Sequence, residues 1–114
     1  MKTIPKGFNP DYAEDEPTLE QVRELVGAAI LEFGAPWCGH CQAAQPAVQE
    51  VLTEHSELHH IKVYDGKGRP LGRTFRVKLW PTLILLRDGQ EVARLVRPVH
   101  ADEVRRFVKQ SETS

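Results

Sequence analysis

Two cysteines, Cys38 and Cys41, are the only thiols of the chain, and just two residues separate them in the stretch APWCGHC. A pair with this spacing can be a redox-active dithiol, half of a metal site, a haem attachment point or two inert buried side chains. Thiol–disulfide exchange needs one thiolate that attacks and a second thiol near enough to displace the product. The rest of the sequence has to decide among these four kinds of chemistry.

The pair is expected at the point where a strand gives way to a helix. Cys38 would then stand at the helix N-terminus, where unpaired amides and the helix dipole stabilise an anion and so favour a nucleophilic thiolate. Cys41, one turn later on the same helix face, would be close enough to Cys38 to form a disulfide and more buried within the helix. Position alone therefore distinguishes an attacking thiol from a resolving one.

The other three interpretations fit less well. A structural zinc site needs four ligands, and His55, His59 and His60 are expected about three helical turns from the thiols. Covalent haem attachment needs a histidine directly after the second cysteine, where this chain has Gln42. Two inert cysteines fit poorly with an exposed Gly-His pair between them. We therefore expect redox chemistry without a metal or a cofactor.

Apolar periodicity predicts the elements that hold this pair. After an irregular lead-in over residues 1–17, Thr18 resembles a helix N-cap and Gln21 completes a capping box. The apolar stripe of this helix, which includes Val26, ends at Gly27. Strands are expected over residues 28–33, 60–65, 82–88 and 91–97, the last at a sheet edge. Further helices are expected over 38–55 with Pro46 inside, for one turn from Pro70, and near the C-terminus with Val104, Phe107 and Val108 on one face.

This order of elements predicts an α/β fold. A strand–helix–strand crossover implies a parallel pair, and the later hairpin adds antiparallel strands. The result is a mixed central sheet with helices on both faces. Residues 18–110 are expected to form the single domain, and residues 111–114 a short tail.

Composition limits the classes of function. The chain has 114 residues and a formal net charge of −1, so nothing directs it to nucleic acid or to an anionic membrane surface. No apolar run reaches the length of a membrane helix, and the N-terminus lacks the apolar region of a secretory signal. We expect a cytoplasmic monomer.

Several motifs together resemble the thioredoxin superfamily over nearly all of the chain beyond residue 18. APWCGHC is similar to its active-site motif, and Pro46 stands where the family has a helix proline. WPT at 80–82 resembles its cis-proline loop, RDGQEV its hairpin turn, and the last helix with Phe107 its closing helix. The resemblance implies the thioredoxin fold and a thiol–disulfide oxidoreductase acting on protein disulfides.

The resemblance also implies roles for single residues. Cys38 corresponds to the nucleophile, Cys41 to the resolving thiol and Pro81 to the cis-proline. In this family the residue before that proline, here Trp80, pairs its backbone with an extended substrate segment, while the proline keeps metals off the thiols. The implied electron donor is a thioredoxin reductase or glutathione.

The residues around the thiols set the expected redox character. Trp37 and Gly39 complete the motif, and the Gly-His pair resembles the protein disulfide isomerases more than the reducing thioredoxins, which carry Gly-Pro. An imidazole at His40 favours thiolate over disulfide, and stabilising the reduced form makes the disulfide a stronger oxidant. The alternative is that His40 is an exposed side chain with no effect on the redox character of the pair.

Glu32 lies six residues before Cys38, where the family often has a buried carboxylate. Among apolar neighbours its pKa would be raised, and it could take the proton of Cys41 through a water molecule. The alternative is a Glu32 side chain that points into solvent. The family lysine beside this carboxylate has no clear match, because Ile61 falls at its place by counting and Lys62 stands next to it.

Three departures from the family bear on substrates. Gly34 replaces a large aromatic residue. Trp80 replaces a small residue, and its ring would either form a bulky apolar rim or pack in the ordinary way. Arg97 stands where the family has a glycine on the substrate side. These changes weaken the expectation that a standard thioredoxin reductase recognises the chain. A rival function is a non-catalytic thioredoxin-like binding or assembly adaptor that holds a partner with its Trp80 and Arg97 surface.

Overall fold

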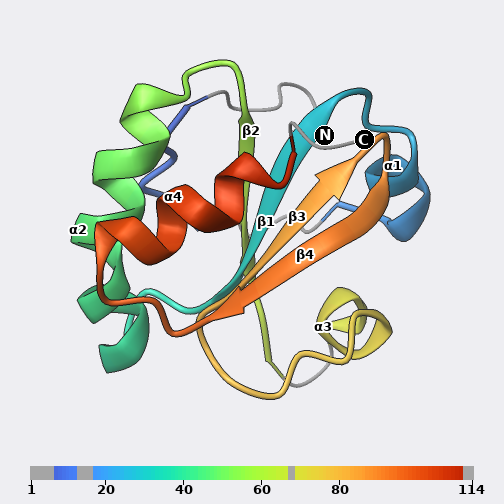
Figure 1. Ribbon diagram of the computed structural model, residues 1–114. Coiled ribbons are helices and arrows are strands. Elements are labelled where there is room, and N and C mark those ends of the chain that lie inside the picture. Colours follow the sequence, from blue (N-terminus) through green and yellow to red (C-terminus); the bar gives the residue numbers. More distant parts are fainter. Residues whose placement is uncertain (1–6, 13–16, 67–68, 112–114) are drawn as a thin grey trace.

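The computed structural model describes residues 7–12, 17–66 and 69–111, and in these it has four strands and four helices (Figure 1). The strands are β1 (Ala28–Gly34), β2 (His59–Tyr64), β3 (Thr82–Arg87) and β4 (Gln90–Val96). The helices are α1 (Leu19–Arg23), α2 (Gly39–Glu54), α3 (Pro70–Thr74) and α4 (Ala101–Lys109). Every strand boundary lies within one residue of the expected one.

The strands form one mixed sheet in the order β2-β1-β3-β4. β1 and β2 are parallel and are joined through α2, whereas β3 is antiparallel to both β1 and β4. This confirms the expected α/β architecture and the place of β4 at a sheet edge. It also puts β1, which leads into the two cysteines, in the interior of the sheet.

Helices cover both faces of the sheet, and successive residues of β1 alternate between two cores. Ile30 packs with apolar residues of α2 and α4 on one face, the left side of Figure 1. Ala29, Leu31 and Phe33 pack with residues of α1 and α3 on the other face. Because the side chains alternate, Glu32 shares the face of Ile30 and lies on the α2 side of the sheet.

The first helix is shorter than predicted. The capping box is present, since the Gln21 amide N–H donates to Thr18 Oγ1 at 3.0 Å and the Thr18 N–H donates to Gln21 Oε1 at 2.9 Å. The helix ends at Arg23, however, and Val26 is 81% exposed, so its assignment to the buried stripe was wrong. The chain turns early because Gly27 N–H is held by Asp88 Oδ1, at 2.8 Å, in the β3–β4 turn.

Residues 7–12, which precede the first helix, lie against β2. Gly7 N–H donates to Leu58 O at 2.7 Å, and Asn9 N–H donates to Nδ1 of His60 at 2.8 Å. The sequence predicted only an irregular lead-in here, and part of it, residues 1–6 and 13–16, lies outside the described residues. The described part brings Tyr12 to the cysteines.

Candidate active site

The two thiols lie at the first turn of α2. Cys38 is the N-cap residue, and its Sγ accepts a hydrogen bond from the Cys41 N–H at 3.2 Å. Both cysteines are free, and Cys41 is the more buried, with 2% of its surface exposed against 9% for Cys38. This is the arrangement expected of an attacking thiol at a helix N-terminus and a resolving thiol behind it.

The buried thiol of Cys41 resists ionisation. Its removal from water raises its pKa to about 11, and the neighbouring Cys38 adds to this effect. Hydrogen bonds from the Ala35 backbone and from the Tyr12 hydroxyl act in the opposite direction. Ionisation of Cys41 at neutral pH therefore needs a group that accepts its proton.

Glu32 is fully buried beneath α2, so the solvent-pointing alternative was wrong. Its Oε1 accepts from His60 Nε2 at 2.8 Å, and its Oε2 accepts from Gln45 Nε2 at 2.9 Å. Burial acts to raise its pKa, but the His60 hydrogen bond, the Lys62 charge and the Gln45 amide together lower the pKa below its usual value. The expected raised pKa was therefore also wrong, and these partners hold Glu32 as a carboxylate.

Lys62 is the buried cation of this site. The β1–β2 register pairs Glu32 with Lys62 and turns Ile61 to the opposite core, so counting along the sequence had placed the wrong residue at this point. Lys62 Nζ donates to Gln45 Oε1 at 2.8 Å and to Pro10 O at 3.1 Å. Burial lowers the pKa of Lys62, although the charge of Glu32 opposes the shift.

His60 is the second partner of Glu32 that sequence reasoning missed. The ring is fully buried, and Asn9 N–H donates to its Nδ1 at 2.8 Å. Nδ1 is therefore the acceptor, which leaves Nε2 to carry the hydrogen that it donates to Glu32. This contact also takes His60 out of any metal site at the thiols.

The loop before β3 lies on the other side of the thiols. The Trp80–Pro81 peptide bond is cis, and the Trp80 ring packs against the cluster of Ala35, Cys38 and Cys41. The Trp80 indole N–H donates to Asp65 Oδ2 at 2.8 Å. Trp80 is thus partly buried between the thiols and Asp65, the residue that follows β2.

Trp37 and Arg97 complete the surface around Cys38. Trp37 is 65% exposed, its indole N–H donates to Tyr64 Oη at 3.0 Å, and its ring meets the Trp80 ring edge-on at 5.5 Å. Arg97 Nε donates to the Trp80 carbonyl at 2.9 Å. Its φ of 52° lies in the left-handed region, which a glycine adopts more easily. Gly39 and His40 lie exposed on the first turn of α2.

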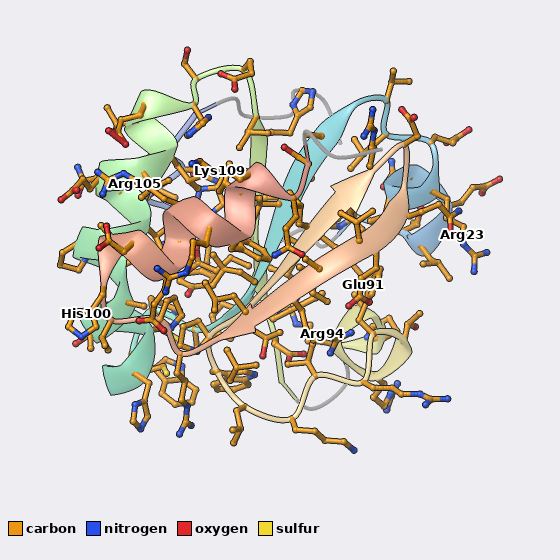
Figure 2. All side chains as sticks on the ribbon, viewed as in Figure 1. Arg23, Glu91, Arg94, His100, Arg105 and Lys109 are labelled. Atoms are coloured by element: carbon orange, nitrogen blue, oxygen red, sulfur yellow. The ribbon has the colours of Figure 1, made fainter. Side chains whose placement is uncertain are left out.

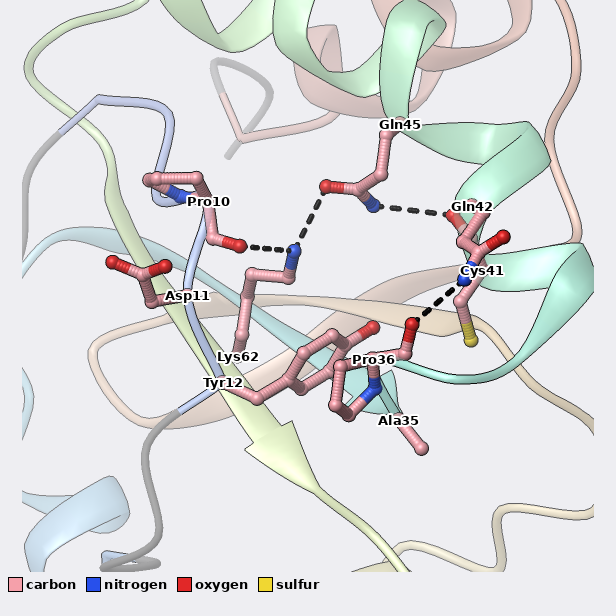
Figure 3. Close-up of a pocket in the computed structure, with 9 residues that line it drawn as sticks. All are labelled: Pro10, Asp11, Tyr12, Ala35, Pro36, Cys41, Gln42, Gln45 and Lys62. Carbon is pink, nitrogen blue, oxygen red and sulfur yellow. Dashed lines mark hydrogen bonds between the residues drawn. The ribbon is translucent and has the colours of Figure 1, made fainter.

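A cavity of about 310 Å³ opens behind Cys41, between the N-terminal segment and α2 (Figure 3). Pro10, Asp11 and Tyr12 line one side of it, and Cys41, Gln42 and Gln45 line the other. Lys62 lies at its floor with dashed bonds to Pro10 and Gln45 in Figure 3. The cavity links Cys41 to the polar groups around Glu32.

The described residues hold neither a cluster of metal ligands nor a helix suited to crossing a membrane. Residues 7–12, 17–66 and 69–111 contain no group of three or more His, Cys, Asp or Glu side chains placed to hold a metal ion. Within the same ranges, no helix has the length and apolar character needed to cross a membrane.

Known proteins resemble this chain in sequence and in structure. The family model described as Thioredoxin matches residues 13–110. Thioredoxin-1 of Caenorhabditis elegans is 35% identical over 108 residues, which covers 95% of this chain and 89% of that protein. Thioredoxin Asp f 28 of Aspergillus fumigatus is 29% identical over 97 residues, covering 85% and 90%. The reduced form of thioredoxin 2 from Pseudomonas aeruginosa PAO1 superimposes with a TM-score of 0.81 at 45% identity, covering 100% of both chains.

Proposed function

The chain belongs to the thioredoxin family, whose members are thiol–disulfide oxidoreductases, and from that premise we propose that Cys38 and Cys41 reduce or exchange disulfides in proteins. In the reducing direction the Cys38 thiolate attacks a substrate disulfide, and one substrate sulfur leaves as a thiolate. Cys41 then attacks Cys38 in the mixed disulfide. The second substrate sulfur leaves, and the Cys38–Cys41 disulfide remains.

The observation that carries this proposal is the position of the two thiols. Cys38 is the N-cap of a long helix and Cys41 lies one turn inside it, with 3.2 Å between Cys38 Sγ and the Cys41 amide nitrogen. The helix end favours the thiolate at Cys38, while burial keeps Cys41 protonated until it is needed. Glu32, held ionised beneath α2, is the proton acceptor for Cys41.

The substrate surface consists of Trp37, Trp80, Pro81 and Arg97. An extended substrate segment pairs with the Trp80 backbone, and the exposed Trp37 ring covers its apolar side chains. Arg97 already donates to the Trp80 carbonyl, so a substrate N–H has to share this oxygen through its second lone pair. The guanidinium thus adds a positive charge directly beside the paired strand.

Within this function the cysteine pair acts as an oxidant or isomerase of protein disulfides, because His40 stands where the reducing thioredoxins have proline. The chain acts as a cytoplasmic monomer with no cofactor, and it receives electrons from a thioredoxin reductase or from glutathione. The adaptor function is the second candidate, and it rests on the same Trp80 and Arg97 surface. Replacing Cys38 and Cys41 by serine separates the two, because an adaptor keeps its partner without the thiols.

The test is the redox equilibrium of the pair in defined ratios of reduced to oxidised glutathione, measured by thiol trapping. We expect an intramolecular disulfide with a potential closer to the isomerase value of about −180 mV than to the thioredoxin value of about −270 mV. His40→Pro should move the potential toward the thioredoxin value. A pair that never forms the disulfide would contradict the oxidoreductase proposal and favour the adaptor.

A further inference from the structure

The hydroxyl of Tyr12 lies between the resolving thiol and the buried carboxylate. Its oxygen lies 3.5 Å from Glu32 Oε2, a long distance for a hydrogen bond to a carboxylate. The hydroxyl also acts to lower the pKa of the Cys41 thiol, as a hydrogen bond donated to that sulfur would. Tyr12 therefore stands beside both ends of the path along which the proton of Cys41 has to travel.

Gly34 provides the space for this contact. A Cβ atom at Gly34 would lie 2.6 Å from Cys41 Sγ and 2.7 Å from Tyr12 Oη, so the sulfur and the hydroxyl both border the space that a side chain here would fill. Real Cβ atoms do not come so close to other heavy atoms. The glycine that departs from the family pattern thus admits a tyrosine from a distant segment.

The Tyr12 ring is held from several sides. Lys62 Nζ lies 4.4 Å from its centroid, and the Tyr64 ring meets it edge-on at 6.4 Å. Lys62 also bonds Pro10 O at 3.1 Å, which fixes the chain two residues before Tyr12. An N-terminal segment anchored in this way can present a hydroxyl at a constant position.

We propose that Tyr12 carries the proton from Cys41 to Glu32 when Cys41 resolves the mixed disulfide. As Cys41 sulfur attacks Cys38, its proton passes to Tyr12 Oη, and the proton of Tyr12 passes to Glu32. The Cys41–Cys38 bond forms, the bond from Cys38 to the substrate sulfur breaks, and the substrate leaves as a thiolate. Glu32 later returns the proton to water through the cavity. This inference rests on the proposed oxidoreductase function.

The surroundings keep Tyr12 neutral, as a relay requires. The ionisable groups that face it are Glu32 on β1, Lys62 and Tyr64 on β2, and the two thiols at the start of α2. Burial first, and then the charges of Glu32 and the thiols, raise the pKa of Tyr12 far above its ordinary value. The hydroxyl therefore keeps its hydrogen and can accept one proton only while it donates another.

The experiment follows the two chemical steps separately in Tyr12→Phe. Resolution is measured as release of a chromophoric thiol from a mixed disulfide preformed on Cys38, across pH 6–10. General acid–base groups contribute about 10² to 10⁴ in rate, and water in the cavity can replace part of this, so resolution should slow about ten- to a hundredfold at pH 7. It should also become dependent on hydroxide, because burial raises the pKa of the Cys41 thiol and the variant lacks the Tyr12 hydroxyl that opposes this shift.

The attack step is the matched control. The rate at which Cys38 attacks a substrate disulfide is measured in two variants, Cys41→Ser and the double variant Cys41→Ser with Tyr12→Phe. The two rates should agree, because Cys38 needs no proton acceptor once it is a thiolate. Gly34→Ala keeps both groups but pushes them apart, and it should reproduce the slow, hydroxide-dependent resolution. Circular dichroism and thermal melts check that both variants fold.

Three results would overturn the relay. Tyr12→Phe could resolve at the wild-type rate with the wild-type pH profile, which would assign the proton transfer to water alone. Attack and resolution could slow by the same factor, which would make Tyr12 a structural residue. Gly34→Ala, if folded, could resolve like the wild type, which would show that the contact is not needed. A failure of Cys38 to form any mixed disulfide would instead contradict the proposed function.

Discussion

The polar residues buried beneath α2 act as a single network. Lys62 donates to the Gln45 carbonyl oxygen, and the Gln45 amide donates in turn to Glu32, so a neutral side chain connects the buried cation to the buried anion. His60 donates to the other carboxylate oxygen, with its own Nδ1 held by Asn9. Removing one member of such a network leaves its partners unpaired in a low-dielectric interior. The resulting loss in the free energy of unfolding is larger than the net contribution of the hydrogen bond itself.

The first prediction concerns the acid stability that Glu32 confers. The pKa of Glu32 is lowered in the folded protein, so the unfolded chain binds its proton first as pH falls. Stability is present above the ordinary pKa of about 4.3 and is lost as pH falls through the folded value. Between these two values Glu32 contributes a slope of about 1.4 kcal/mol per pH unit. We expect Glu32→Gln to remove this slope.

Urea unfolding of the wild type and of Glu32→Gln at a series of pH values measures the difference. Above about pH 6 Glu32 is ionised in both states, so the two stability curves should run parallel there and give an internal control. Below the ordinary glutamate pKa of about 4.3 the wild-type curve should fall more steeply. If the two curves stay parallel down to the acid transition, the network does not lower the pKa of Glu32 in the folded protein.

At the scale of elements, the β3–β4 turn hydrogen-bonds Gly27, which lies between α1 and β1. Asp88 N–H donates to Gly27 O at 2.9 Å, and Asp88 Oδ1 accepts from Gly27 N–H at 2.8 Å. Asp88 and Gly89 both have positive φ, 50° and 80°, and a Cβ at Gly89 would collide with the backbone of Arg23. The turn thus sets where α1 stops and where β1 begins.

We therefore expect Asp88→Ala to lower the free energy of unfolding by about 1–2 kcal/mol, through the lost hydrogen bond and the poor fit of alanine to positive φ. Asp88→Asn is the matched control, because asparagine tolerates this conformation and keeps an acceptor oxygen, and it should cost less than half as much. Urea unfolding measures both variants. Equal losses would show that the side-chain contact to Gly27 contributes nothing.

The elements could be predicted from sequence where the information is local. Short apolar runs predicted the strands and a 3.6-residue apolar pattern predicted α2, while the spacing of Cys38 and Cys41 is visible in the sequence itself. The partners of Glu32 could not be predicted in this way, because they come from α2, β2 and the N-terminal segment. Lys62 was missed because a one-residue change of register exchanges the two faces of β2. Tyr12 belongs to an irregular segment that has no periodic signal.

At the scale of the whole molecule, the net charge is nearly neutral, but the charged residues are unevenly distributed along the chain. The net charge of −1 led us to expect no steering toward nucleic acid or an anionic membrane, but residues 66–87 include six basic residues and no acidic one. Arg73 on α3 and Lys78 in the loop that leads to Trp80 are exposed. Arg97 bonds the Trp80 carbonyl and Lys78 stands two residues before Trp80, so part of this positive charge lies beside the proposed site for a substrate strand.

This distribution predicts a preference among protein substrates. Clustered charge beside a site raises association rates with oppositely charged partners by about 10 to 10³, and salt screens the effect. Reversing Arg73 and Lys78 to glutamate should therefore lower kcat/KM for an acidic disulfide protein about tenfold at low ionic strength, and the loss should shrink in high salt. A small uncharged disulfide should react at the wild-type rate, which separates steering from damage to the thiols.

The matched control reverses Arg106 and Lys109, two exposed basic residues of α4 (Figure 2 labels Lys109). It makes the same change in net charge, but α4 covers the face of the sheet opposite to α3. If the two double variants lose the same factor with the acidic substrate, only total charge matters and a local effect is contradicted. A larger loss for the α3 side, with equal rates for the small disulfide, means that the charge beside Trp80 selects acidic partners.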